Sequence, residues 1–281
     1  MYRSGTADDG EELLAELQSL TTQARKLAEM QRSRVELAVA LQRGMLPREL
    51  PQPPGVRLAV GYVPANHGLN VGGDWYDVFA LPDGRVGMSV GDVQGHNIEA
   101  AAFMGQVRVC LRALASVTGD PGELLARTND LLVSLGADLF ATCTFLLLDP
   151  AEGTLDCARA GHIPHVWATA DGAAGVDDGE GGPPLGVLHG AEYPVTRHRI
   201  ATGGVFVLLT DGVVEGPSLV LEEGLRQVMA LASTAAVEGG DIDALVASVM
   251  RLAGTVGHED DAAVLVVGHD GGAARPGPPG E

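Results

Sequence analysis

The chain has 281 residues, and its 37 acidic and 18 basic side chains give a formal net charge of −19 at pH 7. At roughly 150 residues per domain, this length predicts one large domain, or one domain with an appendage. A hydrophobic content of 46% is enough for a sizeable core, which excludes a wholly disordered chain. The acidic surface repels phosphate backbones and anionic lipids, so we expect no nucleic-acid partner and no membrane partner.

The N-terminal sequence and two residue counts exclude further classes. We expect a soluble, cytoplasmic protein, because no apolar run approaches the roughly 18 residues of a membrane helix and no signal peptide opens the chain. Lys26 is the only lysine, which excludes a P-loop and a kinase active site. Cys110, Cys143 and Cys157 form no CxxC pair, and their apolar neighbours indicate buried structural thiols, so a thiolate zinc site is not supported.

The first segment with a regular pattern is 10–46, which predicts a long amphipathic helix after a disordered start over 1–9. Its apolar residues recur at coiled-coil spacing up to Leu27, and from Met30 onward the stripe continues only with a shift of one position. Pro47 and the prolines that follow it end the helix. Two interpretations remain open, a dimerising stalk and a helix packed on its own domain. The stripe consists of Leu13, Leu17, Leu20, Ala24 and Leu27.

From Val56 onward the pattern changes to short β-like runs with two helical interruptions. Asp83-Gly84 is typical of a hairpin turn between two of these runs. Asp120-Pro121 predicts an N-cap and a first-turn proline for the second helix. Runs of strands separated by pairs of helices predict a layered α+β fold, with antiparallel sheets under helices. The segment 170–184 is expected to be a flexible acidic loop and 269–281 a disordered tail. Strands are predicted over 56–65, 74–82, 85–93, 140–149, 154–161, 164–170, 205–211 and 262–268, and helices over 97–117, 121–136, 221–233 and 241–254.

Four aspartates, Asp74, Asp92, Asp211 and Asp260, follow apolar runs at points where strands are expected to end. A carboxylate at the end of a buried strand is costly unless something pairs with it, and basic residues are scarce here. Oxygen ligands without cysteine or paired histidine favour Mg²⁺ or Mn²⁺. Two ions, about 3.5–4 Å apart, would clamp a phosphoryl group. The alternative is ordinary turn chemistry, which would explain each aspartate taken singly.

Six ordered stretches resemble the PPM-type metal-dependent serine/threonine protein phosphatases, in particular the bacterial branch typified by RsbU and SpoIIE. The resemblance covers 41–268 and includes the helix-ending signature at 41–47. It implies a four-layer α-β-β-α sandwich over 56–268, with the amphipathic helix in front. The stretches are VGGDWYDVFALPDGRVGMSVGDVQGH, AAFMGQVR, ARAGHIPHVW, PPLGV, LLTDGVVEG and EDDAAVLVV.

The resemblance also implies roles for individual residues. It implies two Mn²⁺ or Mg²⁺ ions, and Asp77 and Asp261 are expected to orient their bound waters. A water bridging the two ions would lose its proton near neutral pH and attack phosphorus. The metal ligands implied are Asp74, Asp92, the main-chain carbonyl of Val93, Asp211 and Asp260.

Three histidines and one asparagine lie in the matching motifs. His96 could protonate the leaving group, since its ordinary pKa is near 6.5, or it could be a hydrogen-bonded structural histidine. His162 and His165 are interpreted as structural. Asn97 stands where this branch has glycine, and asparagine is the best replacement if that position needs a positive φ.

The implied function is hydrolysis of phosphoserine or phosphothreonine in a protein. In this branch the substrate is a phosphorylated anti-sigma-factor antagonist of the STAS type, and the stalk over 10–46 is expected to form a homodimer. A second hypothesis is a non-catalytic scaffold that keeps the fold and binds partners through the same helix. A phosphatase for small-molecule phosphates is a third, and the scarcity of arginine around these motifs disfavours it.

Overall fold

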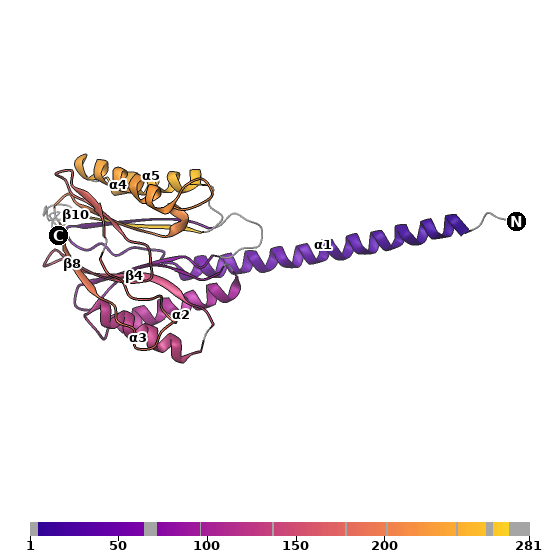
Figure 1. The fold of residues 1–281 in the computed structure, drawn as a ribbon, viewed down its shortest axis with the longest axis horizontal. Helices are drawn as coiled ribbons and strands as arrows, with labels where there is room; N and C mark the ends of the chain where they lie inside the picture. The colour runs from indigo at the N-terminus through magenta and orange to yellow at the C-terminus, as the bar shows by residue number, and fades with distance from the viewer. Residues whose placement is uncertain are drawn as a thin grey trace, which may run out of the picture.

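The computed structural model describes residues 5–64, 72–95, 97–136, 138–177, 179–200, 202–239, 241–256 and 261–269. Within these ranges the strands form two five-stranded sheets, in the orders β1-β10-β9-β6-β7 and β2-β3-β4-β5-β8. Helices α4 and α5 cover the first sheet, and α2 and α3 cover the second (Figure 1). The layers therefore run helix, sheet, sheet, helix, which confirms the predicted α+β sandwich.

The elements have the following bounds. The first sheet contains β1 (Val56–Val63), β6 (Val166–Ala168), β7 (Ala174–Val176), β9 (Val205–Leu209) and β10 (Ala262–His269). The second contains β2 (Trp75–Ala80), β3 (Val86–Val93), β4 (Ala141–Asp149), β5 (Thr154–Ala160) and β8 (Val195–Arg199). The helices are α1 (Gly5–Met45), α2 (Ile98–Ala115), α3 (Pro121–Ser134), α4 (Leu221–Val237) and α5 (Ile242–Val256), with a 3-10 turn η1 (Asp211–Val213) after β9.

The strands with continuous apolar runs lie inside the sheets, because both of their faces are covered. β4 is buried along most of its length between β3 and β5, and β10 between β1 and β9. The hairpin between β2 and β3 turns at Gly84, whose φ of +87° is accessible to glycine at no steric cost. The Asp120 side chain caps α3 by accepting from the Glu123 N–H, and a proline opens the helix. The local turn and cap signals of the sequence thus formed as expected.

The acidic segment 170–184 differs from the prediction of a flexible loop. It contains β7, and beyond β7 the Gly182 N–H donates to the Arg159 carbonyl at 2.8 Å. The Gly161 N–H in turn donates to the Gly182 carbonyl at 2.8 Å. Backbone pairing with the neighbouring strands therefore orders part of a segment whose composition is typical of disorder. The edge strand β8 was also absent from the prediction.

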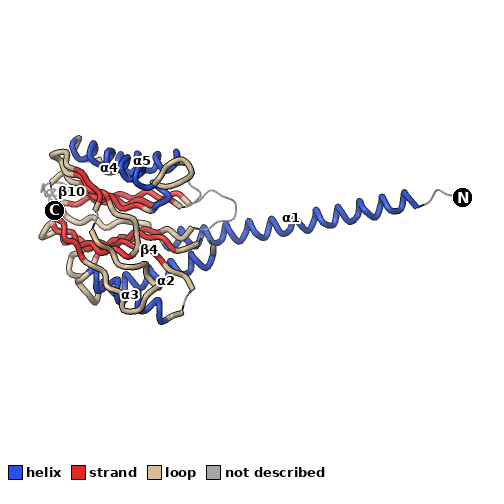
Figure 2. The backbone as a smooth tube through the Cα atoms, in the orientation of Figure 1, coloured by secondary structure: helices blue, strands red, loops and turns tan. Residues whose placement is uncertain are grey.

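Helix α1 extends away from the sandwich as one continuous element, without a break at the shift of its apolar stripe (Figure 2). It begins at Gly5, earlier than predicted, and its 41 residues correspond to about 60 Å. Most of its described side chains are exposed, including leucines of the stripe. Its C-terminal end contacts the domain, where Met45 lies against Gly105 of α2. In the described part of the chain, every helix is too short or too polar to span a bilayer.

Candidate metal centre

Asp74 precedes β2 and is fully buried, at 0% exposure. Neither of its carboxylate oxygens has a hydrogen-bond partner among the described residues. Burial raises the pKa of Asp74 well above its ordinary value, and the charges of Asp92, Asp261 and Asp211 raise it further. Thr210 lowers this pKa in part, although its hydroxyl does not meet hydrogen-bond geometry with either oxygen. A carboxylate in this environment requires a proton or a cation.

Antiparallel pairing brings these carboxylates to one end of the sandwich. Asp74 lies at the start of β2 and Asp92 near the end of β3, where Trp75 pairs with Gly91. Asp211 directly follows Thr210 after β9, and Asp261 directly precedes β10. Because β9 and β10 are antiparallel neighbours, the end of one meets the start of the other. Each sheet therefore contributes two carboxylates to the same end.

Two glycines allow the backbone to pass close to these groups. A Cβ atom at Gly72 would lie 1.6 Å from an Asp261 carboxylate oxygen. A Cβ atom at Gly73 would lie 2.4 Å from the Val93 carbonyl oxygen, and the Val93 N–H donates to the Gly73 carbonyl at 3.3 Å. No larger residue fits at either position without displacing the chain. The structure thus places the Val93 carbonyl beside the segment that carries Asp74.

Tyr62 and Thr210 were given no role by the sequence, yet both hold this end of the sandwich together. The Tyr62 hydroxyl donates to an Asp261 carboxylate oxygen, across 199 residues of chain. Thr210 is buried, and its hydroxyl accepts from the Ala263 N–H at 2.9 Å while its own N–H donates to the Ala263 carbonyl at 3.0 Å. Thr210 was visible in the Thr-Asp-Gly stretch, whereas no local signal marks Tyr62.

The donor set fits a hard divalent cation. It consists of carboxylate oxygens and one main-chain carbonyl, which are the ligands that Mg²⁺ and Mn²⁺ prefer. The unpartnered oxygens of Asp74 are the positions where such an ion would offset the most buried charge. Asp260 and His96, which the sequence also singled out, lie outside the described residues.

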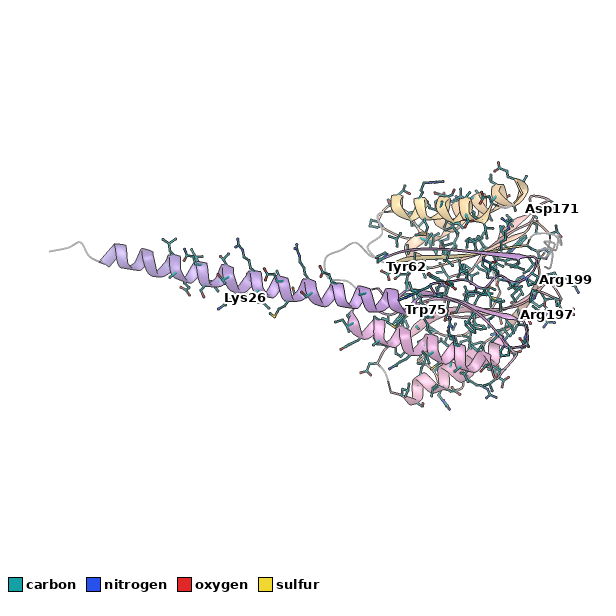
Figure 3. All side chains as sticks on the ribbon, turned by 180° about the vertical axis from the view of Figure 1, so that it is seen from behind. Lys26, Tyr62, Trp75, Asp171, Arg197 and Arg199 are labelled. Carbon is teal, nitrogen blue, oxygen red and sulfur yellow. The ribbon has the colours of Figure 1, made fainter. Side chains whose placement is uncertain are left out.

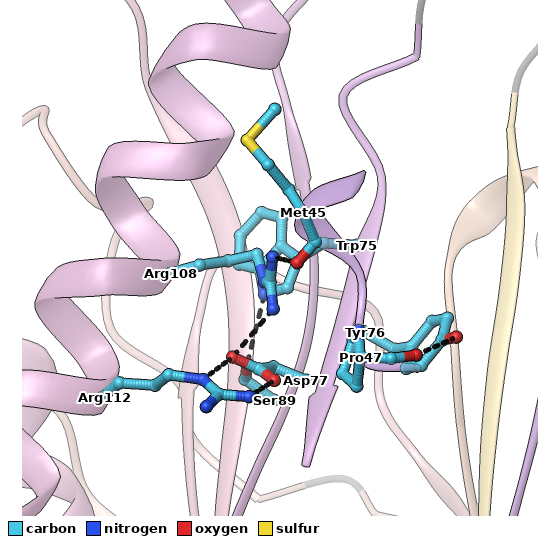
Figure 4. A network of polar contacts seen from close by, with 8 residues as sticks. All are labelled: Met45, Pro47, Trp75, Tyr76, Asp77, Ser89, Arg108 and Arg112. Atoms are coloured by element: carbon cyan, nitrogen blue, oxygen red, sulfur yellow. Dashed lines mark hydrogen bonds and ion pairs between the residues drawn. The ribbon is translucent and has the colours of Figure 1, made fainter. Parts of the chain in front are cut away.

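Asp77 was expected to orient water near the ions, but both of its oxygens are held by arginines of α2. Arg112 forms two hydrogen bonds to it, at 2.7 and 2.6 Å, and Arg108 lies at 3.1 Å (Figure 4). Side chains alternate along a strand, so Asp77 shares the helix-facing surface of β2 with Trp75, whose indole N–H donates to Ser89 at 3.1 Å. Asp77 therefore fixes β2 against α2.

The same network reaches the end of α1. Arg108 also donates to the Met45 carbonyl, and the Tyr76 hydroxyl donates to the Pro47 carbonyl at 3.3 Å (Figure 4). The end of α1 and the residues just after it are therefore bound to α2 and to β2. The β2 residues concerned, Tyr76 and Asp77, lie two and three residues after Asp74. Tyr62 and Trp75 lie at the end of the domain from which α1 emerges (Figure 3).

His162 and Asn97 have structural roles beside the site. The buried His162 bridges the two sheets, with Nδ1 at 2.8 Å from the Thr142 hydroxyl and Nε2 at 3.2 Å from the Leu209 carbonyl. Burial lowers the pKa of His162 to about 4, so it is neutral and donates from Nε2 to Leu209. Asn97 has a φ of −132° and caps α2 by accepting from the Ala100 N–H at 2.8 Å. Its place in the motif thus reflects helix capping rather than a positive φ.

Comparisons with known proteins point to one family. The family model described as Stage II sporulation protein E (SpoIIE) matches residues 82–270, more than half of the chain. Protein IcfG of Synechocystis is 27% identical over 216 residues, covering 66% of this chain and 33% of IcfG. Phosphoserine phosphatase RsbU of Bacillus subtilis is 24% identical over 185 residues, covering 66% of this chain and 54% of RsbU. The chain thus spans about a third to a half of these relatives.

Solved structures agree with this assignment. The RsbU and RsbW domains of Rv1364c from Mycobacterium tuberculosis match with a TM-score of 0.73 and 32% identity, over 83% of this chain and 64% of that one. The SiaA-PP2C domain of Pseudomonas aeruginosa shares the fold, with a TM-score of 0.69 and 21% identity, over 89% of this chain and 98% of that one. The family match, the sandwich fold and the carboxylates at one end of the sandwich together show that this chain belongs to the SpoIIE family of PPM-type phosphatase domains.

Proposed function

We propose that this chain is a Mn²⁺- or Mg²⁺-dependent phosphatase that acts on phosphoserine or phosphothreonine in a protein substrate. The observation that carries the proposal is the buried Asp74 carboxylate, which has no hydrogen-bond partner among the described residues and lies within the electrostatic reach of three other carboxylates. Phosphoserine phosphatases RsbU and RsbP of Bacillus subtilis are among the relatives, which supports a phosphoprotein substrate.

The proposed ligands of two ions are Asp74, Asp92, the Val93 carbonyl, Asp211 and Asp260. Asp261, expected only to orient water, raises the pKa of Asp74 and abuts Gly72, so we include it as a further ligand. When bound, the ions supply a water nucleophile at neutral pH and offset the charge of the phosphoryl oxygens. The charges of Asp92, Asp211 and Asp261 raise the pKa of Asp74, which supports a shared site, and no covalent phosphoenzyme is required.

Hydrolysis of p-nitrophenyl phosphate by the purified chain tests the site assignment. We expect activity with Mn²⁺ and none with EDTA. Asp92→Asn and Asp211→Asn should lower kcat by about 100-fold or more, because direct ligands matter at least as much as the groups that orient them. Asp83→Asn is the matched control, since Asp83 lies exposed in the hairpin turn and pairs with Arg85. Full activity in either ligand variant would contradict the assignment.

His96 is proposed as the general acid that protonates the leaving oxygen. A p-nitrophenolate leaving group needs no proton, whereas a seryl oxygen does. His96→Ala should therefore slow phosphate release from a phosphoserine peptide by about 100-fold or more and leave p-nitrophenyl phosphate hydrolysis nearly unchanged. Equal losses on both substrates would assign His96 a structural role instead.

We propose a phosphorylated anti-sigma-factor antagonist of the STAS type as the protein substrate, following the resemblance to the RsbU and SpoIIE branch. The test is a comparison of phosphate release from such a protein and from a short peptide with the same phosphoserine sequence. A folded partner adds contacts outside the phosphorylated residue, so its kcat/KM should be higher by at least tenfold. Equal kcat/KM values would contradict recognition of a folded antagonist.

We propose that α1 pairs with the α1 of a second copy. Leu13, Leu17, Leu20 and Leu27 recur at coiled-coil spacing and are each more than 50% exposed. Leu17→Asp combined with Leu20→Asp should convert a dimer into a monomer in light scattering. Gln18→Asp combined with Ser19→Asp is the matched control, because these positions lie beside the stripe on the same exposed helix. A double leucine variant that stays dimeric would contradict this pairing.

The contacts of Arg108 suggest how pairing of α1 reaches the metal centre. Arg108 binds both the Met45 carbonyl at the end of α1 and Asp77 on β2. We propose that ordering of α1 fixes β2 through Arg108 and thereby fixes Asp74. Arg108→Gln should weaken Mn²⁺ affinity without loss of the dimer, and unchanged affinity would contradict the coupling.

The competing hypothesis of a non-catalytic scaffold predicts no Mn²⁺ binding that depends on Asp74.

A further inference from the structure

Three side chains with metal-binding atoms gather outside the metal centre described above. They are Cys157 of β5, His165 just before β6, and Asp177 just after β7. The Cys157 sulfur lies 4.0 Å from His165 Nδ1, which lies 3.5 Å from an Asp177 carboxylate oxygen. One ligand atom from each of the three falls within 4.8 Å of the others.

The fold places these residues together from both sheets. Val166 of β6 pairs with Val176 of β7, and the Asp177 N–H continues this ladder by donating to the His165 carbonyl at 2.9 Å. His165 and Asp177 are therefore cross-strand neighbours in the first sheet. Cys157 belongs to the second sheet and faces them across the sandwich. The cluster thus lies between the two sheets, and Asp177 comes from the segment 170–184 that was predicted to be a flexible loop.

The polar atoms around the cluster are incompletely satisfied. His165 is 2% exposed and Cys157 is 3% exposed. Burial lowers the pKa of His165 to about 4 and raises that of Cys157 to about 12, so a neutral imidazole faces a thiol. The Nε2 atoms of His165 and of the nearby His198 have no hydrogen-bond partner among the described residues. Their two rings meet edge to face, with centroids 5.4 Å apart. Buried polar atoms of this kind usually have a partner.

Two further features of the cluster concern Asp177 Oδ1 and the nearby Arg159. Asp177 Oδ1 accepts from the Gly179 N–H at 3.1 Å, which leaves Oδ2 directed at His165. Arg159 donates to the carbonyls of His162 and Gly179, and its positive charge opposes a cation in the cluster. A thiolate and a carboxylate supply two negative charges, which outweigh that single positive charge.

We propose that Cys157, His165 and Asp177 form a second metal site, for a thiophilic divalent ion such as Zn²⁺. Sulfur, imidazole and carboxylate are the ligands that Zn²⁺ binds in proteins, whereas the carboxylate centre offers only oxygens. A tetrahedral ion needs sulfur and nitrogen about 3.5 Å apart, so Cys157 and His165 would approach each other by about half an ångström from their separation of 4.0 Å. Binding replaces the Cys157 thiol proton, which is released to solvent, and His198, whose ring lies 5.4 Å from that of His165, is proposed for the fourth position.

The site would act as a structural clamp rather than a catalytic centre. Cys157 belongs to β5 of the second sheet, whereas His165 and Asp177 bracket β6 and β7 of the first sheet. An ion bound by these three side chains would therefore tie the two sheets together. This proposal does not depend on the phosphatase activity, and it revises our expectations that Cys157 is a structural thiol and His165 a structural histidine.

Titration of the metal-free full-length protein with Co²⁺ tests the proposal. Co²⁺ replaces Zn²⁺ in such sites, and a thiolate ligand gives a ligand-to-metal charge-transfer band in the near ultraviolet. Ions at the carboxylate centre give no such band, because they have no sulfur ligand. We expect the band to grow to one thiolate-bound ion per chain and to disappear when Zn²⁺ is added. Absence of the band in the wild-type protein would overturn the proposal.

Variants identify the ligands. Cys157→Ser should abolish the band, whereas Cys143→Ser, which changes a buried cysteine of the neighbouring strand β4 outside the cluster, should keep it. Retention of the band in Cys157→Ser would overturn the proposal. If circular dichroism shows that Cys157→Ser does not fold, Asp177→Asn is the second test. Asp177 is the more exposed partner of its pair with His165, at 11% against 1%, so we expect this substitution to be tolerated better. Asp177→Asn should weaken Co²⁺ affinity at least tenfold, and unchanged affinity would also overturn it.

Discussion

Replacing Asp74 by asparagine should change the stability of the protein in opposite directions with and without divalent metal. In EDTA, the wild-type protein carries a buried carboxylate that is unpartnered among the described residues, close to the charges of Asp92, Asp211 and Asp261. The amide of asparagine has nearly the same shape and no charge. Neutralising the uncompensated charge should therefore stabilise the metal-free protein, by about 1–3 kcal/mol.

With saturating Mn²⁺ the order should reverse. An ion at 100 times its dissociation constant stabilises the folded state by about 2.7 kcal/mol, so the two proposed ions contribute about 5 kcal/mol, which exceeds the advantage of the variant in EDTA. For a domain of roughly 200 residues, each kcal/mol corresponds to about 2–4 °C in Tm. Mn²⁺ should thus raise the Tm of the wild-type protein by about 10–20 °C and that of Asp74→Asn by much less.

The pH dependence has a fixed sign. The pKa of Asp74 is raised in the folded state above its ordinary value of 3.8. The stabilising contribution of its proton is therefore complete below this value and is lost as pH rises through the folded-state pKa. In EDTA, the wild-type protein should lose stability relative to Asp74→Asn as pH rises above 4. With Mn²⁺ present, this loss should be suppressed.

Differential scanning calorimetry measures all four combinations of protein and metal, and Asp77→Asn is the matched control. Asp77 is equally buried and lies three residues away, but it is paired with Arg108 and Arg112. Its neutralisation leaves those charges without their partner and should lower stability in EDTA by about 3–5 kcal/mol, the opposite sign to Asp74→Asn. The reasoning would be refuted if Asp74→Asn were the less stable protein in EDTA, or if Mn²⁺ stabilised it as much as the wild-type protein.

Three further predictions follow from individual contacts. Gly72→Ala should abolish Mn²⁺ binding in calorimetry, because its Cβ would overlap the Asp261 carboxylate, whereas Gly254→Ala, with open space around it, should not. Asn129→Ala should cost about 1–3 kcal/mol in urea unfolding with Mn²⁺ affinity unchanged, because the buried Asn129 bonds the Gly186 N–H and the Leu188 carbonyl. The pKa of His162 is lowered to about 4, so its contribution to stability is complete above pH 6.5 and is lost as pH falls toward 4; His162→Gln should remove about 3 kcal/mol of this pH dependence. Wild-type Mn²⁺ binding in Gly72→Ala, wild-type unfolding in Asn129→Ala, or wild-type pH dependence in His162→Gln would each contradict the role given to that residue.

The sequence predicted the elements whose signals are local. Apolar runs identified the strands at the centre of each sheet, and Asp120-Pro121 and Asp83-Gly84 identified a helix start and a hairpin. β7 and β8 were not predicted, since β7 has only three residues and β8, VTRHR, is an edge strand with charged side chains. Such strands form because a neighbouring strand supplies backbone hydrogen-bond partners. The local sequence of a short strand does not indicate which strand will pair with it.

The candidate site divides in the same way. Asp74, Asp92 and Asp211 each stand beside glycine at the end of an apolar run, and the structure brings these three together. The bond from Tyr62 to Asp261 and the pairing of Asp77 with α2 join residues distant in the chain. Their partners are set by sheet order and helix packing, so no motif could reveal them. Asp77 was accordingly expected to orient metal-bound water, whereas the structure pairs it with Arg108 and Arg112.

The most direct test of the central claim is a Mn²⁺ binding isotherm of the metal-free protein, measured by calorimetry. The account predicts two ions per chain for the wild-type protein, and at least one fewer, with weaker affinity for any that remains, in Asp74→Asn and Asp211→Asn. A wild-type protein that takes up no Mn²⁺, or variants that bind it as the wild type does, would contradict the claim that these converging carboxylates hold the cations.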